Sequence, residues 1–103
     1  MTVRASILDL LGDGPATTDA LCGALRRLGA PSAQSTVRHA CDDLRWAGDV
    51  AMRLVRTPRH RMGLAVWSLA SESVERVELA VAMLRADARA GVSFGGLRAP
   101  RVA

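Results

Sequence analysis

The stretch QSTVRHACDDLRWAGDV, from Gln34 to Val50, decides how the chain folds. When its residues are placed as in an α-helix, the apolar and small ones occupy about one third of the circle, the usual width of a buried stripe. With Ala33, which directly precedes the stretch, the residues of this stripe are Ala33, Val37, Ala40, Cys41, Leu44, Ala47 and Gly48. The opposite side carries Ser35, Arg38, His39, Asp42 and Arg45. The stretch therefore predicts a helix with one buried side and one charged side.

Two further helices are expected before this one. Thr2 is an N-cap for the first, which ends at Gly12. The apolar residues of this helix recur at helical spacing and are Val3, Ile7, Leu8 and Leu11. The second helix is expected over residues 17–28, where Thr17 and Thr18 offer the N-cap and a following glycine ends the helix. The linker GAPS, residues 29–32, is so short that the second and third helices must cross sharply, and Ser32 is expected to cap the third helix.

After Gly48 the spacing of apolar residues changes from helical to alternating. One side of the first extended run is formed by Val50, Met52 and Leu54. LAVWSLA, residues 64–70, supplies a second run, and Pro58 and Gly63 between the two runs are turn residues. The pattern predicts a hairpin with a basic tip. Its cationic and histidine side chains are Arg53 on the first strand and Arg56, Arg59, His60 and Arg61 around the tip.

A fourth helix is expected from Ser71, which is its cap, to about Ala90, and residues 91–103 resemble a tail. Its apolar residues step by three and four, like positions a and d of a heptad. They are Val74, Val77, Val81, Leu84 and Ala88. This spacing predicts a homodimer seam. Because the pattern covers only about two heptads, packing against the chain's own first helix explains it as well.

The composition favours a single small helical domain with an anionic partner. The chain has 103 residues, half of them hydrophobic, with one Phe, two Trp and no Tyr, so its core is built mainly from Leu, Val and Ala. All 14 cationic residues are Arg, and the net charge is +4. A guanidinium group grips phosphate oxygens with two parallel hydrogen bonds, which suits a phosphate-bearing partner. Coding bias in a GC-rich genome also explains Arg in place of Lys, but it leaves the positive charge unexplained.

Several functional classes lack support in the sequence. Cys22 and Cys41 are too few for a disulfide framework and lack the spacing of a zinc site, so both are expected in the core. The apolar N-terminal stretch is far shorter than the roughly 18 residues that a membrane-spanning helix needs. No phosphate loop, catalytic triad or metalloprotease motif is present. We therefore expect a cytoplasmic protein that is not an enzyme, with no cofactor, metal, membrane or small-molecule partner.

The predicted order is helix, helix, short turn, helix, glycine and basic hairpin. This order resembles the winged helix-turn-helix domains of prokaryotic transcription regulators. The resemblance covers about residues 2–70, and its best-marked piece is STVRHACDDLRWAGDV, followed by WSLA as a closing strand. It implies an α+β fold, mainly α with a small β-hairpin: three helices, a two-stranded wing and a C-terminal helix. The corresponding division is a winged domain over 1–70, a possible dimerisation helix over 71–90 and a flexible tail over 91–103.

The resemblance also implies a function, because in that family the third helix enters the major groove and the wing touches the neighbouring backbone or minor groove. The implied recognition residues are Gln34, Ser35, Thr36, Arg38, His39, Asp42 and Arg45. The implied wing contacts are Arg53, Arg56, Arg59, His60 and Arg61. We expect a sequence-specific double-stranded DNA-binding protein that represses transcription by occupying its operator. A homodimer is expected because it presents two recognition helices to successive major grooves.

Two alternatives remain at this stage. The charged side of the third helix also has the composition of an ordinary solvent-exposed side, and Asp42 lies within one turn of Arg38 and Arg45, where it can neutralise them. The second alternative is a winged helix that binds another protein. Its contact surface would consist of Trp46, the Asp42–Asp43 pair and the last helix. Trp46 projects toward the polar side of its helix, which predicts packing under the wing or against a partner.

Overall fold

The computed structural model describes residues 2–89, together with the side chains of residues 2–87. The predicted tail over 91–103, the helix end at Ala90 and the side chain of Ala88 lie outside that description. The described elements are α1 (Val3–Leu11), β1 (Ala16–Thr17), α2 (Thr18–Arg27), α3 (Gln34–Trp46), β2 (Val50–Thr57), β3 (His60–Leu69) and α4 (Val74–Arg89). The three strands form one antiparallel sheet in the order β1-β3-β2. Four helices and a small sheet within these residues confirm the α+β class.

The first two helices begin at the caps that the sequence predicts. The backbone N–H of Ala5 donates to Thr2 Oγ1 at 3.1 Å, and that of Ala20 donates to Thr17 Oγ1 at 3.1 Å. A threonine oxygen at this position satisfies one of the backbone donors that a helix start leaves unpaired. The strand β1, immediately before α2, was not predicted, because two residues are too short to show an alternating pattern.

The predicted caps of α3 and α4 are each displaced. Ala33 occupies the N-cap position of α3 and makes no side-chain cap, while Ser32 Oγ donates to the carbonyl of Ala30 at 3.3 Å. In α4 the cap is Ser73, whose Oγ accepts from the backbone N–H of Arg76 at 3.3 Å. Ser71 lies in a turn after β3, so it cannot start the helix. Both predictions were wrong by one or two residues.

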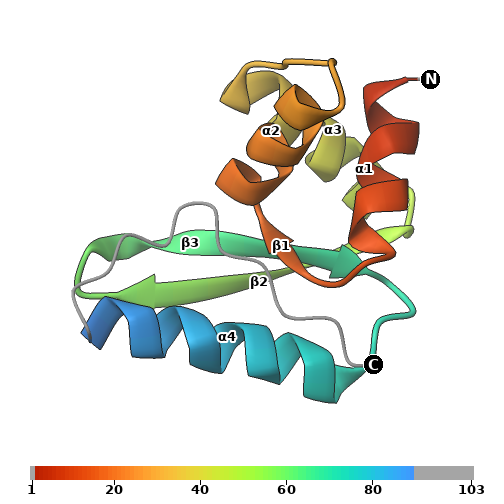
Figure 1. The fold of residues 1–103 in the computed structure, drawn as a ribbon. Helices are drawn as coiled ribbons and strands as arrows, with labels where there is room; N and C mark the ends of the chain where they lie inside the picture. Colours follow the sequence, from red (N-terminus) through yellow and green to blue (C-terminus); the bar gives the residue numbers. More distant parts are fainter. Residues whose placement is uncertain (1, 90–103) are drawn as a thin grey trace.

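The sheet is a middle layer with helices on both sides (Figure 1). On one face, Met52 and Trp67 are cross-strand partners and pack against α1, α2 and α3. The indole N–H of Trp67 donates to Thr18 Oγ1 at 3.0 Å, so this buried ring also satisfies its polar atom. The main core of buried side chains lies here: Ile7, Leu10, Leu11, Ala16, Ala20, Leu21, Ala24, Leu25, Val37, Ala40, Cys41, Leu44, Val50 and Trp67.

The other face of the sheet is covered by α4, which runs along the hairpin (Figure 1). A second cluster of buried side chains joins them and consists of Val55, Val66, Val81 and Leu84. The start of α4 is tied to the segment after α1, because Arg76 Nη2 donates to the carbonyl of Asp13 at 2.9 Å. The fourth helix is therefore part of the folded core rather than an appendage.

This packing corrects the interpretation of the apolar stripe on the fourth helix. Val81 and Leu84 are only 1% and 2% exposed within a single chain, so they cannot form a dimer seam while α4 stays in place. The stripe packs on the sheet, so the alternative that placed it on the first helix was also wrong. Val74 and Val77 remain exposed and half-buried, respectively. The homodimer itself stays a prediction, but it needs a surface other than the one proposed.

The hairpin is longer and less regular than the sequence predicts. Leu54 shares a side of β2 with Val50 but is 46% exposed, because the covered face of β2 changes from the side of α1–α3 to the side of α4. Only Pro58 and Arg59 separate the strands, since Thr57 pairs with His60. Gly63 was expected in the turn and instead lies within β3.

Candidate nucleic-acid interface

The polar residues of α3 lie on different sides of the helix. The buried stripe consists of Val37, Ala40, Cys41 and Leu44. Because successive residues turn by about 100°, one flank of this stripe carries Thr36, His39 and Asp43, and the other carries Gln34, Arg38 and Arg45. Ser35, Asp42 and Trp46 lie opposite the stripe. The residues predicted as one recognition surface therefore divide between a flank that faces α1 and a flank that faces away from it.

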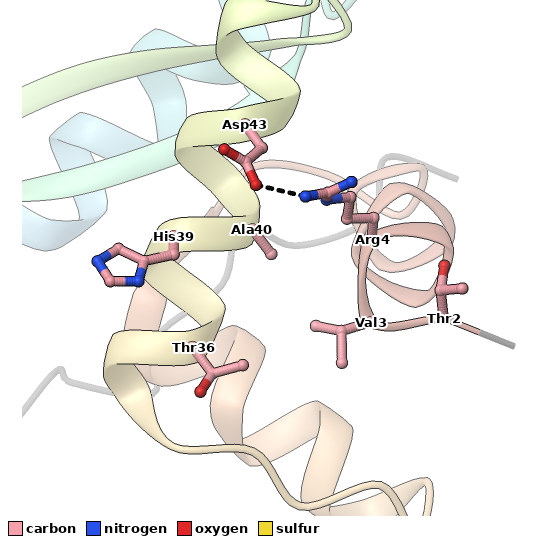
Figure 2. Close-up of a pocket in the computed structure, with 7 residues that line it drawn as sticks. All are labelled: Thr2, Val3, Arg4, Thr36, His39, Ala40 and Asp43. Atoms are coloured by element: carbon pink, nitrogen blue, oxygen red, sulfur yellow. Dashed lines mark hydrogen bonds and ion pairs between the residues drawn. The ribbon is translucent and has the colours of Figure 1, made fainter.

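The flank toward α1 borders a hollow between the two helices (Figure 2). Its lining consists of Thr2, Val3, Arg4, Thr36, His39, Ala40 and Asp43. Arg4 Nη2 of α1 and Asp43 Oδ2 of α3 form an ion pair across it at 2.5 Å. Arg4 was not predicted as a site residue, because its partner is 39 residues away in the chain. An exposed pair of this kind contributes at most about 1 kcal/mol to stability, but it balances the charge of Asp43.

The opposite flank carries two arginines, Arg38 and Arg45. Both are exposed, and among the side chains of residues 2–87 neither one forms an ion pair. The expected neutralisation by Asp42 does not occur as a direct contact, although Asp42 is half-buried on the same side. Each guanidinium group therefore keeps all its N–H donors available to a ligand.

The start of α3 is linked to α2. The side-chain amide of Gln34 donates to the carboxylate of Asp19, which lies in the first turn of α2. This bond spans the crossing of the two helices and occupies an amide that was expected to contact DNA. Ser35, one residue further, is exposed and remains at the open end of the helix, where it can reach a phosphate.

Arg53 was expected to be a wing contact, and the structure uses it differently. Its guanidinium group forms an ion pair with the carboxylate of Glu78 on α4. Val66 is its cross-strand partner and belongs to the cluster under α4, so Arg53 lies on the sheet face that this helix covers. The wing contact of Arg53 stays a prediction, and in the free chain a carboxylate 25 residues later in the sequence balances its charge.

The end of the hairpin keeps its basic character. Arg56, Arg59 and Arg61 are all exposed. Within residues 2–87, Arg56 and Arg61 form no ion pair. His60 is half-buried against Thr57: the backbone N–H of His60 donates to Thr57 Oγ1 at 3.1 Å, and Nδ1 lies 3.3 Å from the same oxygen. We infer that His60 fixes the turn, whereas the arginines around it are presented to solvent.

No protein-family model, curated protein or solved structure matches the chain. The geometry of its own residues therefore carries the functional interpretation.

Two large apolar side chains are exposed beside these arginines. Trp46, next to Arg45 at the end of α3, is 90% exposed, so the expectation that it packs under the wing was wrong. Met62, next to Arg61 in the hairpin, is also 90% exposed. Met62 was not among the residues predicted to contact DNA. Its position between Arg61 and Gly63 was the only sequence signal that could have identified it.

The two cysteines are in environments that disfavour reactive chemistry. Burial, and secondarily the charge of Asp42, raises the pKa of Cys41 from 9.0 to about 12, and burial also raises the pKa of Cys22. Raised thiol pKa values oppose nucleophilic or metal-binding roles, since both require the thiolate. Among the described residues, no group of three or more His, Cys, Asp or Glu side chains is placed to hold a metal ion. No helix within residues 2–89 is long and apolar enough to cross a membrane.

Proposed function

We propose that the chain is a winged helix-turn-helix protein that binds double-stranded DNA at specific sequences and represses transcription by occupying its operator. The observation that carries the proposal is the pair of unpaired arginines, Arg38 and Arg45, on the exposed flank of α3. The hairpin adds a second group of exposed arginines in the same chain. The order of three helices followed by a basic hairpin agrees with the family that the sequence resembles.

In this proposal α3 lies in the major groove. Arg38 donates to O6 and N7 of a guanine, a bidentate contact that distinguishes this base from the other three. Arg45, two turns further along, and Ser35, at the start of the helix, contact phosphates and fix the position of the helix. Asp42 lies between the arginines, where it accepts from a cytosine amino group or disfavours a misplaced phosphate.

The hairpin reaches the neighbouring part of the duplex. Because α4 covers the second face of the sheet, DNA approaches the exposed end of the hairpin rather than its flat side. Arg56, Arg59 and Arg61 gather at this end, where they contact phosphates or a narrow minor groove. If two copies bind a palindromic operator, the dimer contact must leave Val81 and Leu84 in their own core, and sedimentation of the free chain tests whether such a dimer forms.

Selection from a pool of random duplexes tests the proposal directly. The enriched duplex should then bind in a fluorescence-anisotropy titration, with an affinity that falls as salt rises, by about 0.9 log units per log unit of salt for each phosphate contact. The matched control is Arg85→Ala on α4, an exposed arginine on an element that we place away from the DNA. It should bind like the unchanged protein. Absence of any enriched sequence, together with absence of binding at low salt, would overturn the proposal.

One observation favours a second function, a winged-helix adaptor for another protein. Trp46 is almost fully exposed, and exposed tryptophans are common at the energetic centres of protein interfaces. Salt distinguishes the two functions, because an apolar contact through Trp46 persists at high salt whereas a phosphate interface weakens steeply. The charge of Asp43 is already balanced by Arg4, which weakens the acidic part of the adaptor surface.

A further inference from the structure

The hairpin exposes a large apolar side chain, Met62, to solvent. Met62 is 90% exposed, although it lies within β3 between residues that pair with β2. Unbranched and flexible, methionine adapts its shape to irregular apolar surfaces. Isolated exposed apolar residues are common on proteins, so exposure alone assigns no role to Met62.

The strand pairing around Met62 is irregular. The strands pair Val55 with Leu64 and Thr57 with His60, so one residue of β2 lies opposite three residues of β3. This irregularity is a β-bulge, a feature that redirects side chains and often lies beside functional sites. Gly63 makes it possible with a φ of +105°, and a Cβ there would lie 2.5 Å from Leu54 Cδ1. A side chain at residue 63 would therefore strain the backbone and require the Leu54 side chain to move.

The charge around Met62 indicates the kind of partner. Arg61 precedes it, and Arg56 occupies the β2 position opposite the bulge. Arg59 lies in the two-residue turn. An apolar side chain on a hairpin end that carries several exposed arginines fits a ligand with phosphates on its outside and apolar surfaces within. A DNA duplex has this arrangement in its backbone and stacked bases.

We propose that Met62 is a wedge that the hairpin inserts between two base pairs from the minor groove, so that the bound duplex is kinked. This inference rests on the proposed DNA binding and extends it to the shape of the bound DNA. The arginines hold the two phosphate backbones while the methionine side chain separates one base step. Proteins that insert Met, Leu, Ile or Phe in this way bend DNA by about 20–90°. Pyrimidine–purine steps such as TA are the preferred sites, because they unstack most easily.

The test compares Met62→Gln with the unchanged protein on the duplex recovered by selection. Glutamine has nearly the length of methionine but carries a polar end, so it keeps the shape of the hairpin and removes the apolar wedge. Fluorophores at the two duplex ends report bending by energy transfer, and 2-aminopurine placed at each pyrimidine–purine step in turn reports unstacking. The unchanged protein should bend the duplex and raise 2-aminopurine emission at one step. Met62→Gln should lose more than about half of the bend and the rise in emission.

Two further variants complete the design. Met62→Leu keeps an apolar side chain and should retain the bend, whereas Val74→Gln alters another exposed apolar residue, at the start of α4, and should change nothing. Affinity should change by less than about tenfold in Met62→Gln, because the lost burial is offset by base stacking that is no longer disrupted. Binding without bending, or bending that survives Met62→Gln, would overturn the wedge and leave DNA binding intact. Failure to bind any duplex would overturn both.

Discussion

The helices α3 and α4 have the same design in sequence, with an apolar stripe and a charged outer side, but the structure uses their charges differently. On α4, Glu78 pairs with Arg53, and Arg76 lies 3.7 Å from Glu72 and donates to the Asp13 carbonyl, whereas Arg85 further along the helix forms no ion pair with the side chains of residues 2–87. On α3, Arg38 and Arg45 form no ion pair with any side chain in residues 2–87. A charge that already has a protein partner contributes to the fold, whereas a charge without one is available to a ligand.

The buried stripes of the two helices, in contrast, have the same role. Cys41 of α3 and Val81 of α4 are both buried, and they belong to the two clusters on opposite faces of the same sheet. The two helices therefore both belong to the core, and they differ only in what their outer sides do.

The largest effect is expected for Val81→Glu. A carboxylate introduced at this site has no partner in the cluster of Val55, Val66 and Leu84, so the variant should lose about 3–5 kcal/mol of unfolding free energy. Chemical denaturation followed by circular dichroism measures the loss. Val74→Glu is the control, because this residue is 75% exposed. If Val81→Glu instead stays as stable as the parent and converts a dimer to monomers, α4 forms a seam rather than part of the core.

The next effect is an alkaline loss of stability that depends on Cys41. Its pKa lies near 12 in the folded chain and near 9.0 in the unfolded one, so the neutral thiol stabilises the fold fully below pH 9. This contribution declines as the pH rises toward 12, by about 2–3 kcal/mol between pH 8 and pH 11. The chain contains no Lys or Tyr, so few other groups ionise in this range. Cys41→Ala should be less stable at pH 7 but should lose much less stability on going to pH 11. An equally steep decline in that variant would contradict the assignment.

The order of helices and hairpin was predictable because its signals are local. Thr2 and Thr17 cap helices a few residues downstream, and the change from helical to alternating spacing after Gly48 marks the start of the hairpin. The surface that covers an apolar stripe cannot be predicted from such local signals. The spacing of Val81 and Leu84 shows that one side of α4 must be covered, but the same spacing fits a second chain, another helix or a sheet.

The residues of the candidate site were predictable from the sequence, but the ion pairs of its arginines were not. The arginines of α3 and of the hairpin were identified from the sequence, since polar residues opposite an apolar stripe face solvent. Their ion pairs depend on tertiary structure: Arg53 meets Glu78 only because α4 folds back over β2. The bulge that exposes Met62 was also hidden, because Gly63 between two strand-like runs has the local signal of a turn.

Within the proposed interface, Arg38→Ala should weaken binding to the selected duplex by about 1–3 kcal/mol and binding to random duplexes much less. The reason is that the guanidinium group reads a base edge, which exists only at the correct site. Anisotropy titrations with both duplexes measure the difference. Arg76→Ala is the informative control, because this arginine has protein partners and should change stability rather than DNA affinity. Equal losses on both duplexes would make Arg38 a phosphate contact, and no loss on either would make its side of α3 a simple solvent-exposed surface.

A smaller effect is expected at the hairpin for the double variant Arg56→Ala and Arg61→Ala. Each removed phosphate contact should lower the slope of log affinity against log salt by about 0.9, giving a total near 1.8. The loss should be similar for selected and random duplexes, because phosphates carry no sequence information. Titrations at four or more salt concentrations give the slope. A slope identical to that of the unchanged protein would show that the end of the hairpin does not touch DNA.

The smallest effect is expected for the ion pair between Arg53 and Glu78. Because both side chains are about half exposed, the coupling between them should be only about 0.2–1 kcal/mol in a double-mutant cycle of Arg53→Ala and Glu78→Ala. The unfolding free energies of the four proteins give this coupling. DNA affinity should be unaffected by Arg53→Ala beyond a small nonspecific change in net charge, in contrast to Arg38→Ala, since the guanidinium group of Arg53 already has a carboxylate partner. A loss of DNA affinity as large as that of Arg38→Ala would mean that Arg53 leaves Glu78 for a phosphate when DNA binds, and that an ion-pair partner in the free chain does not decide which arginines contact DNA.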